Sequence, residues 1–307
     1  VSAGAALSGA GDLAIGNVVG SNIANVLLIL GLSALIVPLA VNEQLIRQEI
    51  PIMVGASLLF LVLALDGGLS RGEGALLFAL VIAYTIFLVV QSRRASKAVE
   101  AEFADEMPDT TSRWDAHWSV QLLLVAGGLG LLVLGADWLV DAAVAVARAF
   151  GVSDLVIGLT VVAVGTSMPE IATSLVAAWR GERDIAVGNV VGSNIFNIFA
   201  VLGFSSLIAD GGIVVSEAAR NFDLWVMLAV AFACLPIVVT GREIARWEGG
   251  VFLAYYIAYT LYLVLSATQH ASLPAFSSVM LGYVLPLTVI TLIVSFVRNG
   301  IKAPPTV

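Results

Sequence analysis

Oxygen-bearing side chains gather in the sequence GTSMPE, inside an otherwise apolar stretch. Thr166 and Ser167 precede Glu170 by four and three residues, so a helix would carry all three on one face. Pro169 lacks an N–H and crowds the carbonyl one turn back, which opens the helical hydrogen-bond ladder. Carbonyls near Ala163 would then be available as ligands. Within a bilayer, an ionisable residue in such a place is by default a functional-site hypothesis.

Two further pairs of polar residues have the same helical spacing. Ser193 and Asn197 stand one turn apart in an apolar stretch, and Ser21 and Asn25 repeat this arrangement near the start of the chain. These side chains are hard oxygen donors, the type that calcium takes in sets of six to eight. Soft ligands are absent from the motifs, which disfavours zinc, copper and iron. The alternative is that these polar residues join helices to one another without binding an ion.

Both pairs belong to an internal repeat. Residues 12–36, DLAIGNVVGSNIANVLLILGLSALI, match residues 184–208, DIAVGNVVGSNIFNIFAVLGFSSLI, at sixteen of 25 positions with a constant offset of 172. The identities include Asp, Asn, Ser and glycine, so apolar bias does not explain them. The spaced glycines, Gly16 and Gly20 in one copy and Gly188 and Gly192 in the other, are typical of closely packed membrane helices.

The composition points to a lipid environment. Of 307 residues, 60% are hydrophobic and 12% are charged, about half the charged fraction of a soluble domain. Stretches of roughly 20 apolar residues, the length needed to cross a bilayer, recur along the chain. They predict an all-α membrane protein with about nine complete spans, near 14–37, 50–66, 73–91, 120–147, 152–178, 184–208, 222–240, 247–266 and 277–297.

The order of the spans predicts an inverted repeat. Five crossings separate the two copies of the motif, so the copies run in opposite directions, as in many secondary transporters with a midplane site. Basic residues concentrate on one side, which carries eleven of the 14 Lys and Arg residues. That side is therefore predicted to be cytoplasmic, and the chain is expected to be a multi-pass protein of the cell (inner) membrane.

The repeat also predicts the division of the chain. Applying the offset places the partner of GTSMPE before Val1, so we expect the first helix and half of the second to be missing and this chain to exchange ions poorly without them. The expected parts are the remainder of the first repeat (1–91), a cytoplasmic linker (92–119), the second repeat (120–266), and an extra C-terminal span with its tail (267–307).

These motifs resemble those of the calcium/cation antiporters, the sodium/calcium exchanger superfamily, in its prokaryotic form. GTSMPE followed by GNVVGSNIFN is similar to the second α-repeat of that family, and GNVVGSNIAN to the latter half of the first. The resemblance implies two inverted bundles of five helices, adjacent sodium and calcium positions, and alternating access. By motif position, the implied cation ligands are the Ala163 carbonyl and the side chains of Thr166, Ser167, Glu170, Ser193, Asn197, Ser21 and Asn25.

The predicted function is therefore calcium/sodium antiport by a monomer in the bilayer, with inorganic cations as partners. Enzymatic activity, a cofactor and a nucleic-acid partner are not expected. Proton/calcium exchange and a non-transporting remnant are the alternatives, and Asn197 stands where several exchangers carry Asp, which leaves the stoichiometry open. A hydrolase that uses Ser167 is disfavoured because no intramembrane His or Lys could serve as its base. Asp137 and Asp141 fit either a structural role or a gate.

Overall fold

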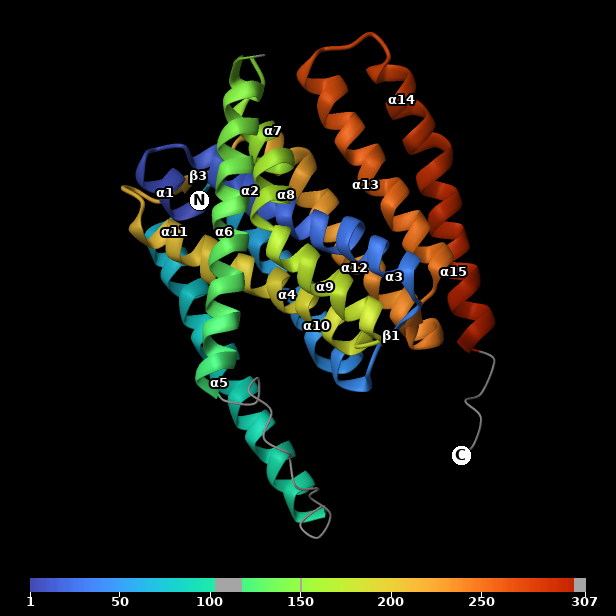
Figure 1. Cartoon of the computed structure of the whole chain (residues 1–307). Coiled ribbons are helices and arrows are strands. Elements are labelled where there is room, and N and C mark those ends of the chain that lie inside the picture. The colour runs from blue at the N-terminus through green and yellow to red at the C-terminus, as the bar shows by residue number, and fades with distance from the viewer. Residues whose placement is uncertain (103–117, 150, 301–307) are drawn as a thin grey trace.

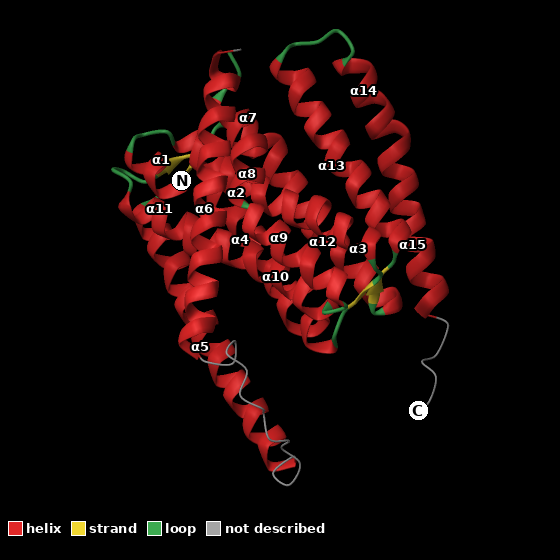
Figure 2. Cartoon of the chain, viewed as in Figure 1, coloured by secondary structure: helices red, strands yellow, loops and turns green. Residues whose placement is uncertain are grey.

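Apolar helices form most of the chain in the computed structural model, which describes residues 1–102, 118–149 and 151–300 (Figure 1). Very short strands and turns connect the helices (Figure 2). In the first half the elements, where η marks π- and 3-10 helices, are α1 (Ser2–Leu7), α2 (Gly11–Ala24), η1 (Asn25–Leu30), α3 (Gly31–Ile36), β1 (Leu39–Ala40), η2 (Leu45–Glu49), α4 (Ile50–Leu63), η3 (Ala64–Asp66), β2 (Gly68–Leu69) and α5 (Arg71–Glu102).

The second half begins with elements that have no counterpart among those of the first, then repeats their order except for η3, and adds a helical segment at its end. Its elements are α6 (Trp118–Ala149), α7 (Asp154–Ile157), η5 (Gly158–Val162), α8 (Ala163–Thr166), α9 (Met168–Arg180), α10 (Arg183–Phe196), η6 (Asn197–Leu202), α11 (Gly203–Ile208), β3 (Ile213–Val214), η7 (Ala219–Asp223), α12 (Leu224–Gly241), β4 (Glu243–Ile244), α13 (Arg246–Ala267), α14 (Leu273–Val279), η8 (Met280–Val284) and α15 (Leu285–Gly300).

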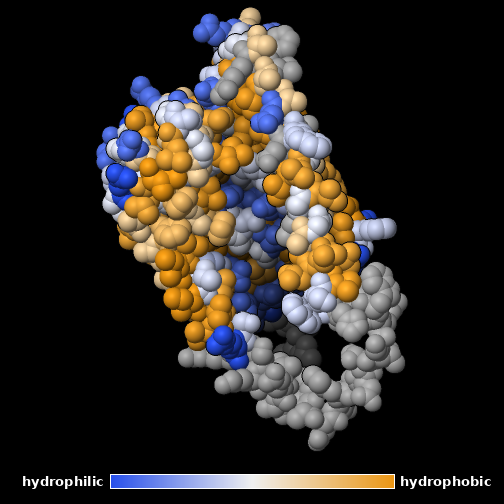
Figure 3. Space-filling view, turned by 60° about the vertical axis from the view of Figure 1, so that its left-hand side comes forward, coloured by the Kyte–Doolittle hydropathy of each residue, from blue (hydrophilic) through white to orange (hydrophobic). Residues whose placement is uncertain are grey.

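The predicted spans agree with the helices. Within the described residues, eight helices are long and apolar enough to cross a membrane, and the bent pair Asp154–Thr166 and Met168–Arg180 brings the number to nine. Each coincides with one of the nine predicted spans to within a few residues. Apolar side chains cover most of the face in Figure 3, where a strip of polar side chains lies in a hollow between two apolar regions.

The structural repeat is longer than the 25 residues that match in sequence. β1 pairs with β4, and β2 pairs with β3, so each strand of one half is joined to a strand of the other half. The π-helices recur as well. η1 begins at Asn25 and η6 begins at its repeat counterpart Asn197, and η2 and η7 both lead into an apolar span. π-helical turns are frequently found at functional sites.

Close helix packing follows the glycines in the first copy of the repeat. A Cβ added at Gly20 would lie 2.5 Å from the carbonyl oxygen of Leu159, and Gly16 packs against Gly158 in the same way. This contact brings α2 directly against η5, and every side chain of α2 from Ala14 to Ala24 is buried. Gly192 in the second copy has open space around it among the described residues. The packing prediction is therefore confirmed for the first pair of glycines.

Adjacent glycines in α13 provide a test of this packing. A Cβ at Gly249 would lie 2.7 Å from Ala34 Cβ and 2.8 Å from the Gly31 oxygen, whereas the nearest atom to a Cβ at Gly250 is Leu35 Cδ2 at 4.0 Å. Gly249→Ala should destabilise the protein by about 1–3 kcal/mol because it forces the helices apart. Gly250→Ala, the control, should be neutral or stabilising by up to about 1 kcal/mol, because Ala favours a helix.

Thermal unfolding in detergent measures both variants. Equal unfolding temperatures for Gly249→Ala and Gly250→Ala would contradict the close contact between α13 and α3.

Parts of the predicted linker and tail differ from expectation or lie outside the described residues. α5 continues from its span through the basic residues to Glu102, so the polar linker begins as a helix, and residues 103–117 are outside the described part. Asp141 lies on α6 and is exposed. The side chain of Asp137 and residues 301–307 are outside the described part.

Candidate cation site

The span that carries GTSMPE is broken at Ser167. Two helices meet there at 48°, and Ser167 has a non-helical backbone with φ −91° and ψ 6°. The cause is local, since Pro169 cannot donate to a carbonyl in the preceding turn and fits best in the first turn of a new helix. The break leaves Thr166 at the end of α8 and Glu170 in the first turn of α9.

Three oxygen atoms form a triangle at this break. The Ser21 hydroxyl lies 3.2 Å from the Ala163 carbonyl oxygen and 3.3 Å from the Thr166 hydroxyl, which itself lies 3.3 Å from the Ala163 oxygen. Ligand distances of 2.3–2.6 Å around calcium give edges of roughly 3.3–3.7 Å between neighbouring oxygens in an octahedral shell. The triangle therefore has close to the size of one face of such a shell. The sequence suggested that the Ala163 carbonyl would be free. It instead accepts a hydrogen bond from the Ser167 backbone N–H at 3.2 Å, and the hydroxyls of Ser21 and Thr166 are also within bonding distance of it.

Asn17 orients the Thr166 hydroxyl. The shortest contact of that hydroxyl is a hydrogen bond of 2.7 Å to Asn17 Oδ1, and Asn17 Nδ2 in turn donates to the Ser2 hydroxyl at 2.7 Å. The Thr166 hydroxyl also lies 2.9 Å from the Val162 carbonyl oxygen of its own helix, and because it carries one hydrogen it donates to one of these acceptors at a time and keeps its lone pairs for other contacts. The sequence motifs gave no role to Asn17, although its repeat mate Asn189 makes the corresponding bond to Ser174, at 2.9 Å.

Glu170 is a half-buried carboxyl without a counter-charge. Its Oε2 atom is shielded from solvent and has no hydrogen-bond partner, and no basic side chain pairs with it in the described part of the chain. An unpaired charge costs several kcal/mol on leaving water. No three His, Cys, Asp or Glu side chains converge among the described residues. A cation at the break would therefore meet carbonyl, hydroxyl and amide oxygens together with the Glu170 carboxylate.

Four asparagines cross-link the two copies of the repeat. Asn25 Nδ2 donates to Asn194 Oδ1 at 2.9 Å, and Asn197 Nδ2 donates to Asn22 Oδ1 at 3.1 Å. The offset of 172 relates Asn25 to Asn197 and Asn22 to Asn194, so each of these bonds is the repeat counterpart of the other. An approximate two-fold axis therefore lies between α2 and α10. Asn22 and Asn194 also donate to each other's backbone carbonyl oxygens, at 3.4 and 3.3 Å. This reciprocity is the structural counterpart of the inverted repeat.

The predicted site residues occupy different positions relative to the triangle. Ser21 and Thr166 form it with the Ala163 carbonyl, whereas Asn25 and Asn197 belong to the asparagine cross-link. No hydrogen bond joins the side chains of Ser167, Glu170 or Ser193 to the triangle in the described part of the chain. Ser167 is 3% exposed, while Ser193 and Asn197 are half-buried. The Oδ1 atom of Asn25 is buried without a partner, which leaves one acceptor available at the centre.

Asn22 and Asn194 belong to the asparagine cross-link at the candidate site, and the motif analysis missed them. The signal was present, since both are identical members of the NVVGSN segment in the two copies. Spacing alone places them on the helix face beside Ser21 and Asn25, and only the crossing of α2 over α10 reveals that they meet.

Comparisons with known proteins found a matching family, related sequences and a similar structure. The family model of the sodium/calcium exchanger protein matches residues 1–90 and 120–265. A putative antiporter, CaxA of Alkalimonas amylolytica, is 42% identical over 272 residues, which are 87% of this chain and 83% of that one. The sodium/calcium exchanger MaX1 of Methanosarcina acetivorans is 34% identical over 84% of this chain and 82% of its own length.

A solved structure of the sodium-calcium exchanger NCX_Mj, soaked with 10 mM Na⁺ and no Ca²⁺, is also similar. It matches with a TM-score of 0.62 and 33% sequence identity, and the match covers 83% of this chain and 79% of that one.

Proposed function

This chain belongs to the sodium/calcium exchanger family, and from that premise we propose that it exchanges calcium for sodium across a membrane by alternating access. The cation would bind at the Ala163 carbonyl and at the side chains of Thr166, Ser167, Glu170, Ser193, Asn197, Ser21 and Asn25. The transporter would act as a monomer in the cell inner membrane.

The oxygen triangle at the helix break carries this proposal. Ser21 comes from one copy of the repeat, and Ala163 and Thr166 come from the segment just before the other copy, so a bound cation would join the two halves of the protein. The size of the triangle fits calcium or sodium, since both take hard oxygen ligands. Sites at the interface of inverted repeats are the ones that rocking movements expose to each side in turn.

The charge of the site supports a cationic cargo. Glu170 has no basic partner among the described residues, so its carboxylate is stable at this depth only when a cation or a proton neutralises it. Calcium and sodium would compete for the same oxygens, and that competition is what couples their movements. A proton could replace sodium at the carboxyl group, but it makes no use of the neutral oxygens of the triangle.

Calcium flux in proteoliposomes tests the proposal. We expect vesicles that contain the full-length protein and internal sodium to accumulate calcium when diluted into sodium-free buffer, at least about tenfold faster than vesicles with equal sodium on both sides. Protein-free vesicles give the background. Calcium uptake that is driven by a proton gradient and unaffected by sodium would show that the protein exchanges calcium for protons and not for sodium. An absence of uptake under both gradients, with protein present in the membrane, would contradict exchange activity.

A further inference from the structure

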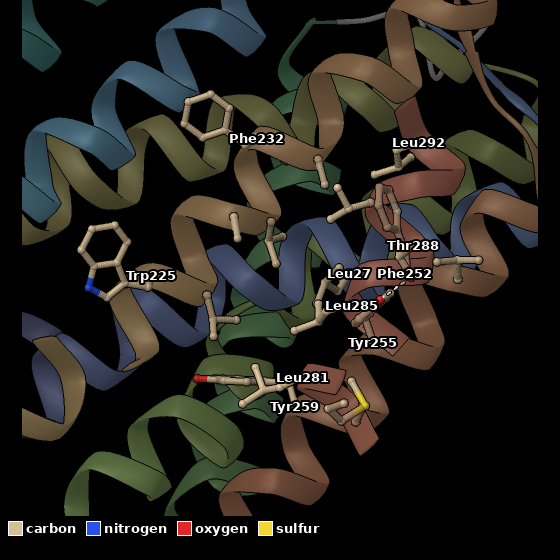
Figure 4. A pocket seen from close by; sticks show the side chains of 18 of the residues that line it. Leu27, Trp225, Phe232, Phe252, Tyr255, Tyr259, Leu281, Leu285, Thr288 and Leu292 are labelled. Atoms are coloured by element: carbon tan, nitrogen blue, oxygen red, sulfur yellow. Dashed lines mark hydrogen bonds between the residues drawn. The ribbon is translucent and has the colours of Figure 1, made fainter. Parts of the chain in front are cut away.

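A large apolar cavity separates the C-terminal helical segment from the rest of the bundle. It has a volume of about 1090 Å³ and lies between α12, α13 and the continuous helix α14–η8–α15. Figure 4 shows its wall, with Tyr255, Leu285, Thr288 and Leu292 on one side and Leu27 of the central π-helix η1 at its floor. Apart from Leu27, the residues of the cavity wall lie outside the motifs discussed above, and the proposed exchange makes no use of the cavity.

The cavity is long and runs with the helices. Along the end of η7 and α12 its lining extends from Phe222 to Ile237, a distance of roughly 22 Å at about 1.5 Å per residue. The hydrocarbon core of a bilayer is about 30 Å thick, so the cavity follows most of that depth. An extended hydrocarbon chain that lies parallel to the spans has this shape, whereas a compact solute does not.

Three of the few polar groups in the wall have partners within the protein. The hydroxyls of Tyr255 and Thr288 lie 2.5 Å apart, and the Tyr259 hydroxyl donates to the buried Asp223 at 2.8 Å. The rest of the lining is almost entirely aliphatic and aromatic. Water would find few partners there, and an empty space of this size would deprive its wall of dispersion contacts. The chemistry of the wall therefore selects an apolar occupant.

The wall is continuous with the outer apolar surface of the protein. Trp225, Phe232, Leu281 and Ile293 line the cavity and are also 53%, 48%, 67% and 57% exposed. The three elements that enclose the cavity are candidate membrane spans, Ala219–Val238, Arg246–Ala267 and Leu273–Val294. A side chain exposed on such a span faces lipid, so the cavity opens to the bilayer and not to water.

We propose that this cavity is a binding site for a membrane phospholipid, which inserts an acyl chain between the C-terminal helix and the bundle. The chain would lie against Leu27, two residues beyond Asn25, and would join α15 to α12 and α13 through dispersion contacts. The aromatic side chains of Phe222, Trp225 and Tyr262 gather at one end of the cavity, and Phe222 and Tyr262 have ring centroids 4.3 Å apart. Aromatic residues of this kind are enriched at the level of lipid headgroups, so the headgroup would lie at this end.

Two alanines on α13 give a matched test. Ala258 lines the cavity, whereas Ala254, one turn away on the same helix, faces outward and does not line it. Protein reconstituted with phosphatidylethanolamine and phosphatidylglycerol is extracted in mild detergent, washed, and examined by native mass spectrometry. We expect a phospholipid to remain on the parent and on Ala254→Trp, and Ala258→Trp to retain at least fivefold less because its indole fills the cavity.

A second filling variant guards against misfolding of the first. Ala233→Trp places the same bulk on the opposite wall, on α12, and it should also reduce retained lipid at least fivefold. Elution volume and thermal unfolding show whether each variant is folded. Equal lipid retention by the parent and by a folded Ala258→Trp or Ala233→Trp would overturn the proposal. Retention of detergent alone, or of a second copy of the protein in place of lipid, would overturn it as well.

Discussion

Glu170→Gln should reduce sodium-driven calcium uptake at least about 100-fold, which corresponds to about 2.7 kcal/mol in the barrier to transport. The substitution keeps the shape of the side chain and one carbonyl oxygen, so the geometry of the break at Ser167 is preserved. It removes the carboxylate charge that no basic side chain balances among the described residues. Calcium, being divalent, needs more charge compensation than sodium, so calcium binding should suffer more than sodium binding.

The same variant separates a structural role for Glu170 from a role in binding. Because the Oε2 atom is buried and unpaired, neutralising the side chain should raise the unfolding temperature of the ion-free protein, or leave it unchanged. The increase in unfolding temperature that calcium produces in the parent should disappear. Glu182→Gln, at an exposed acid near the start of α10, should behave like the parent. Parental calcium uptake by Glu170→Gln would show that the carboxylate has no part in transport.

The fold was predictable because its main signals are long and redundant. Each span needs only about 20 apolar residues, and exchanging one apolar residue for another does not erase the pattern. The repeat was visible because polar and glycine residues recur at a fixed offset, and the structure converts those identities into contacts, as with Asn22 and Asn194. The β1–β4 and β2–β3 pairings were not predictable, since two-residue strands carry no periodicity.

The candidate site was predictable in its residue types but not in its bonding. Pro169 correctly indicated the break, yet the consequence drawn for the Ala163 carbonyl was incomplete. Spacing along one helix cannot reveal that Ser21, from a helix 142 residues earlier, reaches this carbonyl. The role of Asn17 was missed for the same reason, since its partners Ser2 and Thr166 lie on two other helices. Such contacts depend on how helices cross, which the glycines control only indirectly.

Thr166→Val should lower calcium uptake at least about tenfold, or about 1.4 kcal/mol. Valine has nearly the shape of threonine, so the change removes one corner of the oxygen triangle and leaves the packing of α8 in place. It also deprives Asn17 Oδ1 of its donor, which should lower the stability by about 1–3 kcal/mol. Thr166→Ser restores the hydroxyl and should recover most of the transport.

Thr160→Val is the matched control, because Thr160 lies in the same span and donates its hydroxyl only to the Val156 carbonyl of its own helix, at 2.6 Å. The measurement is the initial rate of sodium-driven calcium uptake at several calcium concentrations, normalised to protein in the vesicles. A lost ligand should raise the calcium concentration needed for half-maximal uptake in Thr166→Val and leave it unchanged in Thr160→Val. If both valine variants lose transport equally, or if Thr166→Ser fails to recover, the hydroxyl of Thr166 serves helix structure and the triangle is not where calcium binds.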